Sequence, residues 1–203
     1  RFDSIVPDDI NERAIAEMQR LEAERLTPSG MKPPHTGTPL DECYPPPSVI
    51  GEYLRLPQIH GIIESFVGPN PRFDHDWTHH IAPHARYTQP LHVDAITDSD
   101  DPTFDIQLFW YPHDVAPGEG GTRFVPGSHL RRVRSSGLDR YQHITGEQQF
   151  SGSAGTVVVV TSQDDDSIQI SAPSTSGVAV PASTVPSAPV FVFSSHVPPG
   201  RAR

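Results

Sequence analysis

The sequence predicts an α+β fold in which antiparallel strands dominate. Two segments, 8–26 and 48–66, repeat apolar residues at helical spacing, whereas 104–111 alternates as a strand does and 157–160 is a run of valines. The chain also contains 23 prolines in 203 residues, which favours turns and irregular connections over long helices. Together these patterns predict a few helices packed beside a set of strands.

The first helix is expected over residues 8–26, with Asp8 or Asp9 as its N-cap. The sequence Thr27-Pro28-Ser29-Gly30 ends it, because proline and glycine both stop helices. A Pro-rich connection then runs to residue 47. The apolar stripe that predicts this helix consists of Ile10, Ala14, Met18 and Leu21.

Helical spacing resumes at Ser48 and contains a second helix start. Proline is favoured at the first position of a helix, and the residues after Pro57 carry an apolar stripe as far as Phe66. Gly68-Pro69-Asn70 stops the pattern. The stripe consists of Ile59, Ile62, Ile63 and Phe66 and indicates a core-facing helix rather than a site.

Residues 74–80 contain three histidines and two aspartates, and His84 follows them. Pro83 interrupts the segment, and no regular alternation aims these side chains at one point. We therefore interpret it as a strand whose polar residues line a cleft or face water, rather than as a second metal centre.

Residues 104–111 predict a strand with two different faces, because side chains in a strand alternate between its sides. The strand at 155–160 is apolar on both sides, which is typical of a fully buried strand. In the first of these strands, one face consists of Asp105, Gln107, Phe109 and Tyr111, and the other of Ile106, Leu108 and Trp110.

Composition limits the classes of partner. The formal net charge is −10, from 15 basic and 25 acidic residues, so we expect no nucleic-acid partner. Cys43 is the single cysteine, which excludes an internal disulfide and a cysteine-based zinc site. No apolar run reaches the length of a membrane span and no charged leader opens the chain, so we expect a cytoplasmic protein without a membrane partner. The pattern does not indicate an oligomeric state.

His92 and Asp94 form the strongest candidate metal pair. They are two residues apart in a segment with strand character, so their side chains point to the same face. One imidazole and one carboxylate are two thirds of the 2-His-1-carboxylate triad that holds Fe(II) and leaves positions open for a cosubstrate and O2. An H-x-D pair alone is weak, because it arises by chance in a chain with 11 histidines.

The context of this pair makes it more specific. The segment Q-P-L-H-V-D at 89–94 is followed by Trp110, sixteen residues after Asp94, and then by the turn G-E-G-G-T-R-F-V-P-G-S-H at 118–129. In this order the three pieces resemble the phytanoyl-CoA dioxygenase family of Fe(II)/2-oxoglutarate oxygenases. The resemblance covers about residues 48–160.

The resemblance implies a fold, an activity and a set of site residues. The fold is a double-stranded β-helix, or cupin-like jelly roll, with flanking helices. The activity is a dioxygenase that uses Fe(II), 2-oxoglutarate and O2 to hydroxylate a small organic substrate. His92 and Asp94 would bind iron, and Gln89 and Trp110 would lie beside 2-oxoglutarate, although Trp110 equally suits a buried core. The family position of His129 shapes its loop and does not bind iron.

The tail after Val160 has no histidine where the family carries its distal iron ligand, and three interpretations stay open. In the first, 161–188 is an insertion, His196 is the third ligand and Arg201 or Arg203 binds 2-oxoglutarate. In the second, an altered reading frame or splice has removed both ligand and arginine. In the third, two protein ligands hold the metal weakly.

We expect one domain over 1–203, consisting of an N-terminal helix and connection (1–47), the family-like core (48–160) and a divergent Ser/Pro/Val-rich tail (161–203). The missing distal motif favours an alternative to the enzyme, which is a jelly-roll binding module or a catalytically impaired pseudoenzyme. A metal-binding cupin-like enzyme that needs no keto acid is a further alternative.

Overall fold

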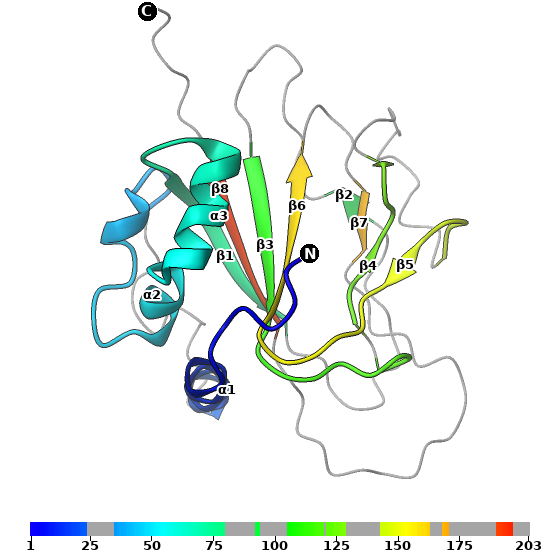
Figure 1. Cartoon of the computed structure of the whole chain (residues 1–203), viewed down its shortest axis with the longest axis horizontal. Helices are drawn as coiled ribbons and strands as arrows, with labels where there is room; N and C mark the ends of the chain where they lie inside the picture. Colours follow the sequence, from blue (N-terminus) through cyan, green and yellow to red (C-terminus); the bar gives the residue numbers. More distant parts are fainter. Residues whose placement is uncertain are drawn as a thin grey trace, which may run out of the picture.

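A computed structural model of the chain describes residues 1–23, 35–79, 92–93, 105–119, 121–128, 143–162, 168–170 and 190–196. Figure 1 shows the helices on one side of a sheet made of β1, β8, β3 and β6, and a second sheet on the other side of that sheet. The helices are α1 (Asp8–Ala23), α2 (Val49–Leu54) and α3 (Pro57–Val67), with a short 3-10 turn η1 (Leu40–Glu42). The strands are β1 (Arg72–His79), β2 (His92–Val93), β3 (Asp105–Tyr111), β4 (Arg123–Phe124), β5 (Gln148–Gln149), β6 (Thr156–Ser162), β7 (Ile168–Ile170) and β8 (Val190–His196).

The helix starts follow local chemistry. The Ser48 side chain accepts a hydrogen bond from the backbone N–H of Gly51 and caps α2, and Pro57 opens α3 as the sequence predicts. The predicted N-cap of α1 was wrong. Asp8 and Asp9 lie inside the first turn of the helix rather than at the N-cap. The carbonyl of Pro7 accepts the first hydrogen bond of that helix, from Asn11. The two aspartates stabilise this end as negative charges beside unpaired N–H groups.

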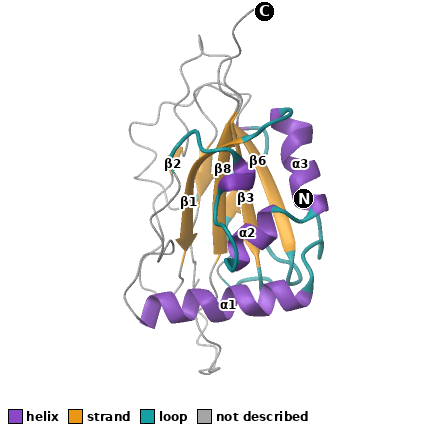
Figure 2. Cartoon of the chain, turned by 90° about the vertical axis from the view of Figure 1, so that its left-hand side faces the viewer, coloured by secondary structure: helices purple, strands orange, loops and turns teal. Residues whose placement is uncertain are grey.

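Within the described residues, the two sheets are antiparallel and each has four strands. Sheet A has the order β1-β8-β3-β6, and sheet B has the order β2-β7-β4-β5. Figure 2 shows α2 and α3 lying over the strands of sheet A, with α1 running across one end. The α+β class with antiparallel strands is confirmed. The segment predicted as a divergent tail supplies a strand to each sheet, and β8 lies between β1 and β3.

Strand β3 separates two apolar clusters, as its alternation predicts. Ile106, Leu108 and Trp110 are buried in the large core with the helices, which defines the outer face of sheet A. Phe109 and Tyr111 belong to a smaller cluster that includes Phe124 of β4, so the opposite face of β3 is the inner face, directed toward sheet B. The inner cluster also contains Val115 and Phe150, with Val158 and Val160 packed against it.

The N-terminal segment completes the outer face. The backbone of Phe2 bonds in both directions with that of Val157, and the N–H groups of Ile5 and Val6 donate to the carbonyl of Gly155. Gly155 has φ of +76°, a conformation that suits glycine. These bonds hold the segment against β6 and deliver α1 to the core.

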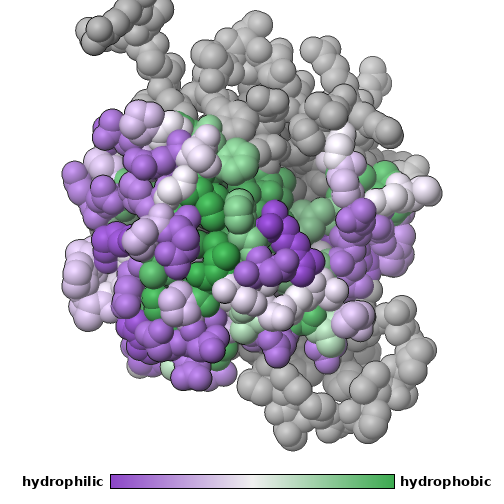
Figure 3. Space-filling model, in the orientation of Figure 1, coloured by the Kyte–Doolittle hydropathy of each residue, from purple (hydrophilic) through white to green (hydrophobic). Residues whose placement is uncertain are grey.

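The surface over the helices is mixed in polarity. Figure 3 shows apolar residues gathered in the middle of the face that carries α3 and the N-terminal segment, with hydrophilic residues around them. Phe66 of α3, 42% exposed, is the one large apolar side chain classed as exposed within the described ranges. None of the helices described here is both long and apolar enough to cross a membrane.

Candidate metal centre

The backbone of β2 places His92 in sheet B. His92 lies opposite Gln169 of β7, and Gln169 lies opposite Phe124 of β4, so these positions form one row across the sheet. Residues directly opposite one another in an antiparallel sheet share a face. Phe124 packs edge-on against Phe109 of sheet A with ring centroids 5.2 Å apart, so this row belongs to the inner face. Position 92 is therefore on the face that the two sheets share.

The other predicted ligands are placed less completely. Asp94 lies outside the described residues, as do Gln89, His129 and Arg201. His196 is the last residue of β8 in sheet A, where its position lies opposite Arg72 of β1 and Asp105 of β3. The two candidate histidines thus belong to different sheets. The described part of β7, the strand next to His92, reads Ile168-Gln169-Ile170 and contains no histidine.

Trp110 lies on the outer face of sheet A, in the core under the helices. Its ring stacks on that of Tyr53 with centroids 4.2 Å apart and planes at 3°, and its Nε1 donates to Oδ1 of Asn11 at 2.9 Å. The alternation of β3 forces this placement, because Phe109 and Tyr111 occupy the inner face. Trp110 has the core role that the sequence left open, and its contact with 2-oxoglutarate stays a prediction that this placement does not favour.

Gln107 is a polar residue of the inner face. Its side chain is buried, with 3% of the residue exposed, and its Oε1 has no hydrogen-bond partner among the described residues. Beyond Phe109 along the same face lies Tyr111, whose ring stacks on Phe150 at 3.7 Å. Burial raises the pKa of the Tyr111 phenol, so this group stays neutral. The sequence predicted that Gln107 shares a face of its strand with Phe109 and Tyr111, but it did not assign Gln107 to a site.

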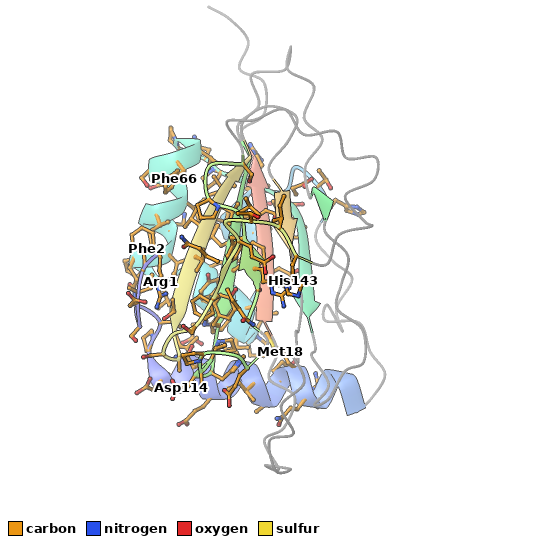
Figure 4. All side chains as sticks on the ribbon, turned by 90° about the vertical axis from the view of Figure 1, so that its right-hand side faces the viewer. Arg1, Phe2, Met18, Phe66, Asp114 and His143 are labelled. Atoms are coloured by element: carbon orange, nitrogen blue, oxygen red, sulfur yellow. The ribbon has the colours of Figure 1, made fainter. Side chains whose placement is uncertain are left out.

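A second polar group lies on the opposite side of sheet B from Phe124. Arg123 of β4 has a side chain only 2% exposed, and its Nη1 lies 3.0 Å from Nδ1 of His143 and 3.7 Å from Oε1 of Glu147. His143 Nδ1 is 2.7 Å from the same carboxylate oxygen. Figure 4 shows His143 on the far side of the strands from Phe66. No sequence pattern singled out this cluster, because arginine in a two-residue strand carries no periodicity.

The electrostatics of this cluster favour an ionised Glu147. Burial by itself raises the pKa of the Glu147 carboxyl, but hydrogen bonds with His143 and the Ile144 N–H, together with the Arg123 charge, lower the pKa by more than burial raises it. The net shift is downward. Among the residues described by the structure, no group of three or more His, Cys, Asp or Glu side chains is arranged to hold a metal ion.

Sequence comparison identifies one family. The profile of the family described as phytanoyl-CoA dioxygenase (PhyH) matches residues 11–182, which is most of the chain. No curated protein sequence matches the chain.

Solved structures with the same fold share little sequence with this chain. AviO1 from Streptomyces viridochromogenes Tue57 is 20% identical, with a TM-score of 0.62 over 99% of this chain and 90% of that protein. HygX from Streptomyces hygroscopicus, with nickel and 2-oxoglutarate bound, is 13% identical with a TM-score of 0.62, covering 96% of this chain and 81% of HygX. The non-heme α-ketoglutarate-dependent epimerase SnoN from nogalamycin biosynthesis is 15% identical with a TM-score of 0.52, covering 99% and 81%. At such identities the likeness concerns the fold.

Proposed function

Because the chain belongs to the phytanoyl-CoA dioxygenase family, we propose that it is an Fe(II)- and 2-oxoglutarate-dependent dioxygenase that hydroxylates a small organic substrate. The family is one of 2-oxoglutarate-dependent oxygenases, so Fe(II) and 2-oxoglutarate are the implied cofactors. The observation that carries the proposal is the strand register, which puts position 92 on the inner face together with Phe124.

The strand order supports a double-stranded β-helix as the complete fold. Two antiparallel sheets of four strands each share an apolar cluster, and strands alternate between the sheets along most of the chain. Such a closed arrangement leaves a space between the sheets in which a cofactor can lie. We propose that the space is bounded by the inner faces of β3 and β4.

His92 and Asp94 are the proposed iron ligands, with His196 as the third. Imidazole and carboxylate groups match the donor set that non-heme iron prefers. When bound, iron and 2-oxoglutarate together activate O2, so that one oxygen atom enters succinate as CO2 leaves and the other converts a substrate C–H to C–OH. Gln89 and Arg201 are proposed to bind 2-oxoglutarate, the arginine by paired hydrogen bonds to a carboxylate.

The chain's own inner face supplies a dry and shaped environment. Phe109 and Tyr111 are almost fully buried on this face, while Phe124 is half-buried. Excluding water in this way strengthens polar contacts to a bound substrate and prevents side reactions. The buried oxygen of Gln107 shows that this face is not entirely apolar.

One observation favours the alternative of a binding module or pseudoenzyme. The described stretch of β7 beside His92 contains no histidine, and position 196, although it lies opposite Asp105 on the inner face, belongs to the other sheet. If His196 does not reach the iron, two protein ligands hold the metal weakly. The chain then keeps the scaffold and a pocket for a small molecule without turnover.

The nature of the substrate is a further part of the proposal. HygX has been crystallised with nickel, 2-oxoglutarate and hygromycin B, and SnoN with Fe3+, α-ketoglutarate and nogalamycin RO. Both bound molecules are small organic compounds. We propose a substrate of this broad kind, with O2 as cosubstrate, no membrane or nucleic-acid partner, and the cytoplasm as the compartment.

The test is an anaerobic titration of the purified protein with Fe(II) and 2-oxoglutarate. The visible charge-transfer band of the chelated keto acid reports a formed site. His92→Ala, Asp94→Ala and His196→Ala are compared with His143→Ala, a matched control because His143 is exposed and lies outside the inner face. We expect the band in the wild type and the control, and its loss in the His92 and Asp94 variants.

Each outcome decides between the two candidate functions. Loss of the band in His196→Ala as well establishes three ligands and supports the dioxygenase. A band that survives in His196→Ala but not in His92→Ala removes His196 from the site. Absence of the band in the wild type supports the binding module, and a band independent of His92 contradicts the proposed centre.

A further inference from the structure

Gln107 has a hydrogen-bonding capacity that no described residue uses. The residue is 3% exposed, and the carbonyl oxygen Oε1 of its side chain is buried without a partner in the described part of the chain. A buried polar atom without a partner costs stability, and proteins rarely keep one without a reason. A ligand that supplies the missing donor is such a reason.

The position of Gln107 connects this oxygen with the proposed site. It is two residues before Phe109 on β3, and its cross-strand neighbour on β6 is Val160, which packs against the inner cluster. Gln107 is therefore on the inner face, which also holds the row of His92 and Phe124.

The side chains of the inner face near this residue are not all buried. Val158, Val160 and Phe124 pack against the inner cluster but keep part of their surface exposed, whereas Phe109 is 1% exposed. A ligand that lies against this face would cover that exposed surface.

The chemistry of the free oxygen restricts the ligand. A carbonyl oxygen only accepts hydrogen bonds, so its partner must be a donor. Ionised 2-oxoglutarate and O2 have no hydrogen-bond donor, so neither of them can pair with the Gln107 oxygen. An uncharged acceptor in a buried position is best matched by an uncharged donor, because burying an ammonium group without a counter-charge is costly. A hydroxyl group meets both conditions.

We infer that Gln107 is a substrate-binding and specificity-determining residue, and that the substrate is a neutral hydroxylated molecule, one hydroxyl of which donates to Gln107 Oε1. The inference rests on the proposed function, because it places the substrate at the same centre. It adds the chemical class of the substrate, an alcohol or polyol, and the contact that orients it toward the metal.

The test uses Gln107→Met, which keeps the shape of the side chain and removes its polar atoms. Gln149→Met is the matched control, because Gln149 also has a buried amide atom without a described partner but lies in the row of Arg123, on the opposite side of sheet B from Phe124. The probes are methyl hexosides and their single deoxy analogues. Binding to the anaerobic protein with Fe(II) and 2-oxoglutarate is measured by calorimetry.

We expect a hexoside to bind the wild type and Gln149→Met, and to bind Gln107→Met about tenfold more weakly or worse. One deoxy analogue should lose the same factor on the wild type and nothing further on Gln107→Met, which identifies the hydroxyl involved. Without ligand, Gln107→Met should unfold roughly 3 °C higher than the wild type, because an unpaired buried oxygen has been removed.

Equal hexoside affinity in the wild type and Gln107→Met would overturn the inference, since a bound water would then satisfy Oε1. Failure of every hexoside to bind the wild type would do the same. The charge-transfer band, recorded on the same samples, separates this failure from that of the proposed function. A band retained by a wild type that binds no hexoside contradicts only the role of Gln107, and a missing band contradicts the metal centre itself.

Discussion

The outer and inner faces of β3 differ in whether their buried polar atoms have hydrogen-bond partners. On the outer face, the indole N–H of Trp110 donates to Asn11, and the ring is stacked on Tyr53 beneath the helices. On the inner face, two positions from Phe109, the Gln107 oxygen is equally buried but has no described partner. The buried indole N–H on the outer face of this strand is therefore hydrogen-bonded, whereas the buried Gln107 oxygen on the inner face has no described partner.

The two faces of β3 are expected to contribute differently to stability and to ligand binding. The helix-covered core contains most of the large buried apolar side chains, whereas the inner cluster is small and has half-buried members. We therefore expect substitutions on the outer face to lower the free energy of unfolding without changing cofactor binding. Substitutions on the inner face should change ligand binding more than stability.

The largest effect is expected for Trp110→Ala. Removing a buried indole leaves a cavity under α2 and should lower the free energy of unfolding by about 4 kcal/mol, measured by urea denaturation. Trp110→Phe keeps a six-membered aromatic ring but loses the pyrrole part of the indole and the bond to Asn11. It should lose less stability than Trp110→Ala, remain folded, and bind Fe(II) and 2-oxoglutarate as the wild type does. Weaker cofactor binding by folded Trp110→Phe would show that Trp110 belongs to the site and would contradict its assignment to the outer core.

A smaller loss is expected for Gly155→Ala, which tests how the N-terminal segment is attached to the outer face. A Cβ atom here would lie 2.5 Å from the carbonyl oxygen of Val6, and the φ of +76° is unfavourable for alanine. We expect a loss of about 3 kcal/mol by urea denaturation. Gly146→Ala is the control, since Gly146 also has a positive φ but nothing within 4 Å of its Cβ position. Equal losses in both variants would assign the effect to backbone strain alone.

Asn11→Ala tests the hydrogen bonds of the outer core. Asn11 accepts from Trp110 and donates to the carbonyl of Val6 at 3.1 Å, so its replacement removes both of these buried hydrogen bonds. We expect a loss of about 2 kcal/mol in the free energy of unfolding. The double variant Asn11→Ala/Trp110→Phe should lose less than the sum of the single variants. Strict additivity would mean that this hydrogen bond contributes nothing.

The smallest effect is expected at Glu147, on the side of sheet B away from the inner face. Its pKa is lower in the folded protein than its ordinary 4.5, so its contribution to stability is complete above pH 4.5 and is lost as the pH falls through the folded value. Glu147→Gln should cost about 1 kcal/mol at neutral pH and flatten the pH dependence of unfolding in the acid range. An unchanged acid dependence in this variant would contradict the assigned role.

Periodicity predicted the framework of the fold because each pattern is local. The helices at 8–26 and 57–66 correspond to α1 and α3, and the strand at 104–111 corresponds to β3 with its two faces as expected. The strands β4 and β5 have only two residues each, which is too short for any period to appear. The sequence predicts an insertion or an altered tail at 161–188, whereas the structure has the strand β7 in this segment. Strand β7 could not be predicted because it has three residues and is formed by pairing with β2 and β4, which are distant in the sequence.

The candidate site could be predicted only where a motif named its residues. The spacing between His92 and Asp94 identifies His92 as a candidate, and the strand register puts position 92 on the inner face. The burial of Gln107 was not predictable, because an alternating strand does not show which of its polar residues lacks a partner. The outer placement of Trp110 could have been read from the alternation of β3, since Trp110 shares a face with Ile106 and Leu108 rather than with Phe109.

The position of β8 has a consequence for how the protein is made. Residues 190–196 form the final described strand, yet they occupy the middle of sheet A between β1 and β3. During synthesis on the ribosome, β1 and β3 are therefore made before the strand that pairs with both of them, and long-range pairings of this kind fold slowly. Until then these two strands expose unpaired backbone edges that invite aggregation. A nascent chain stopped before residue 190 is thus expected to require chaperones rather than to persist as a shorter working protein.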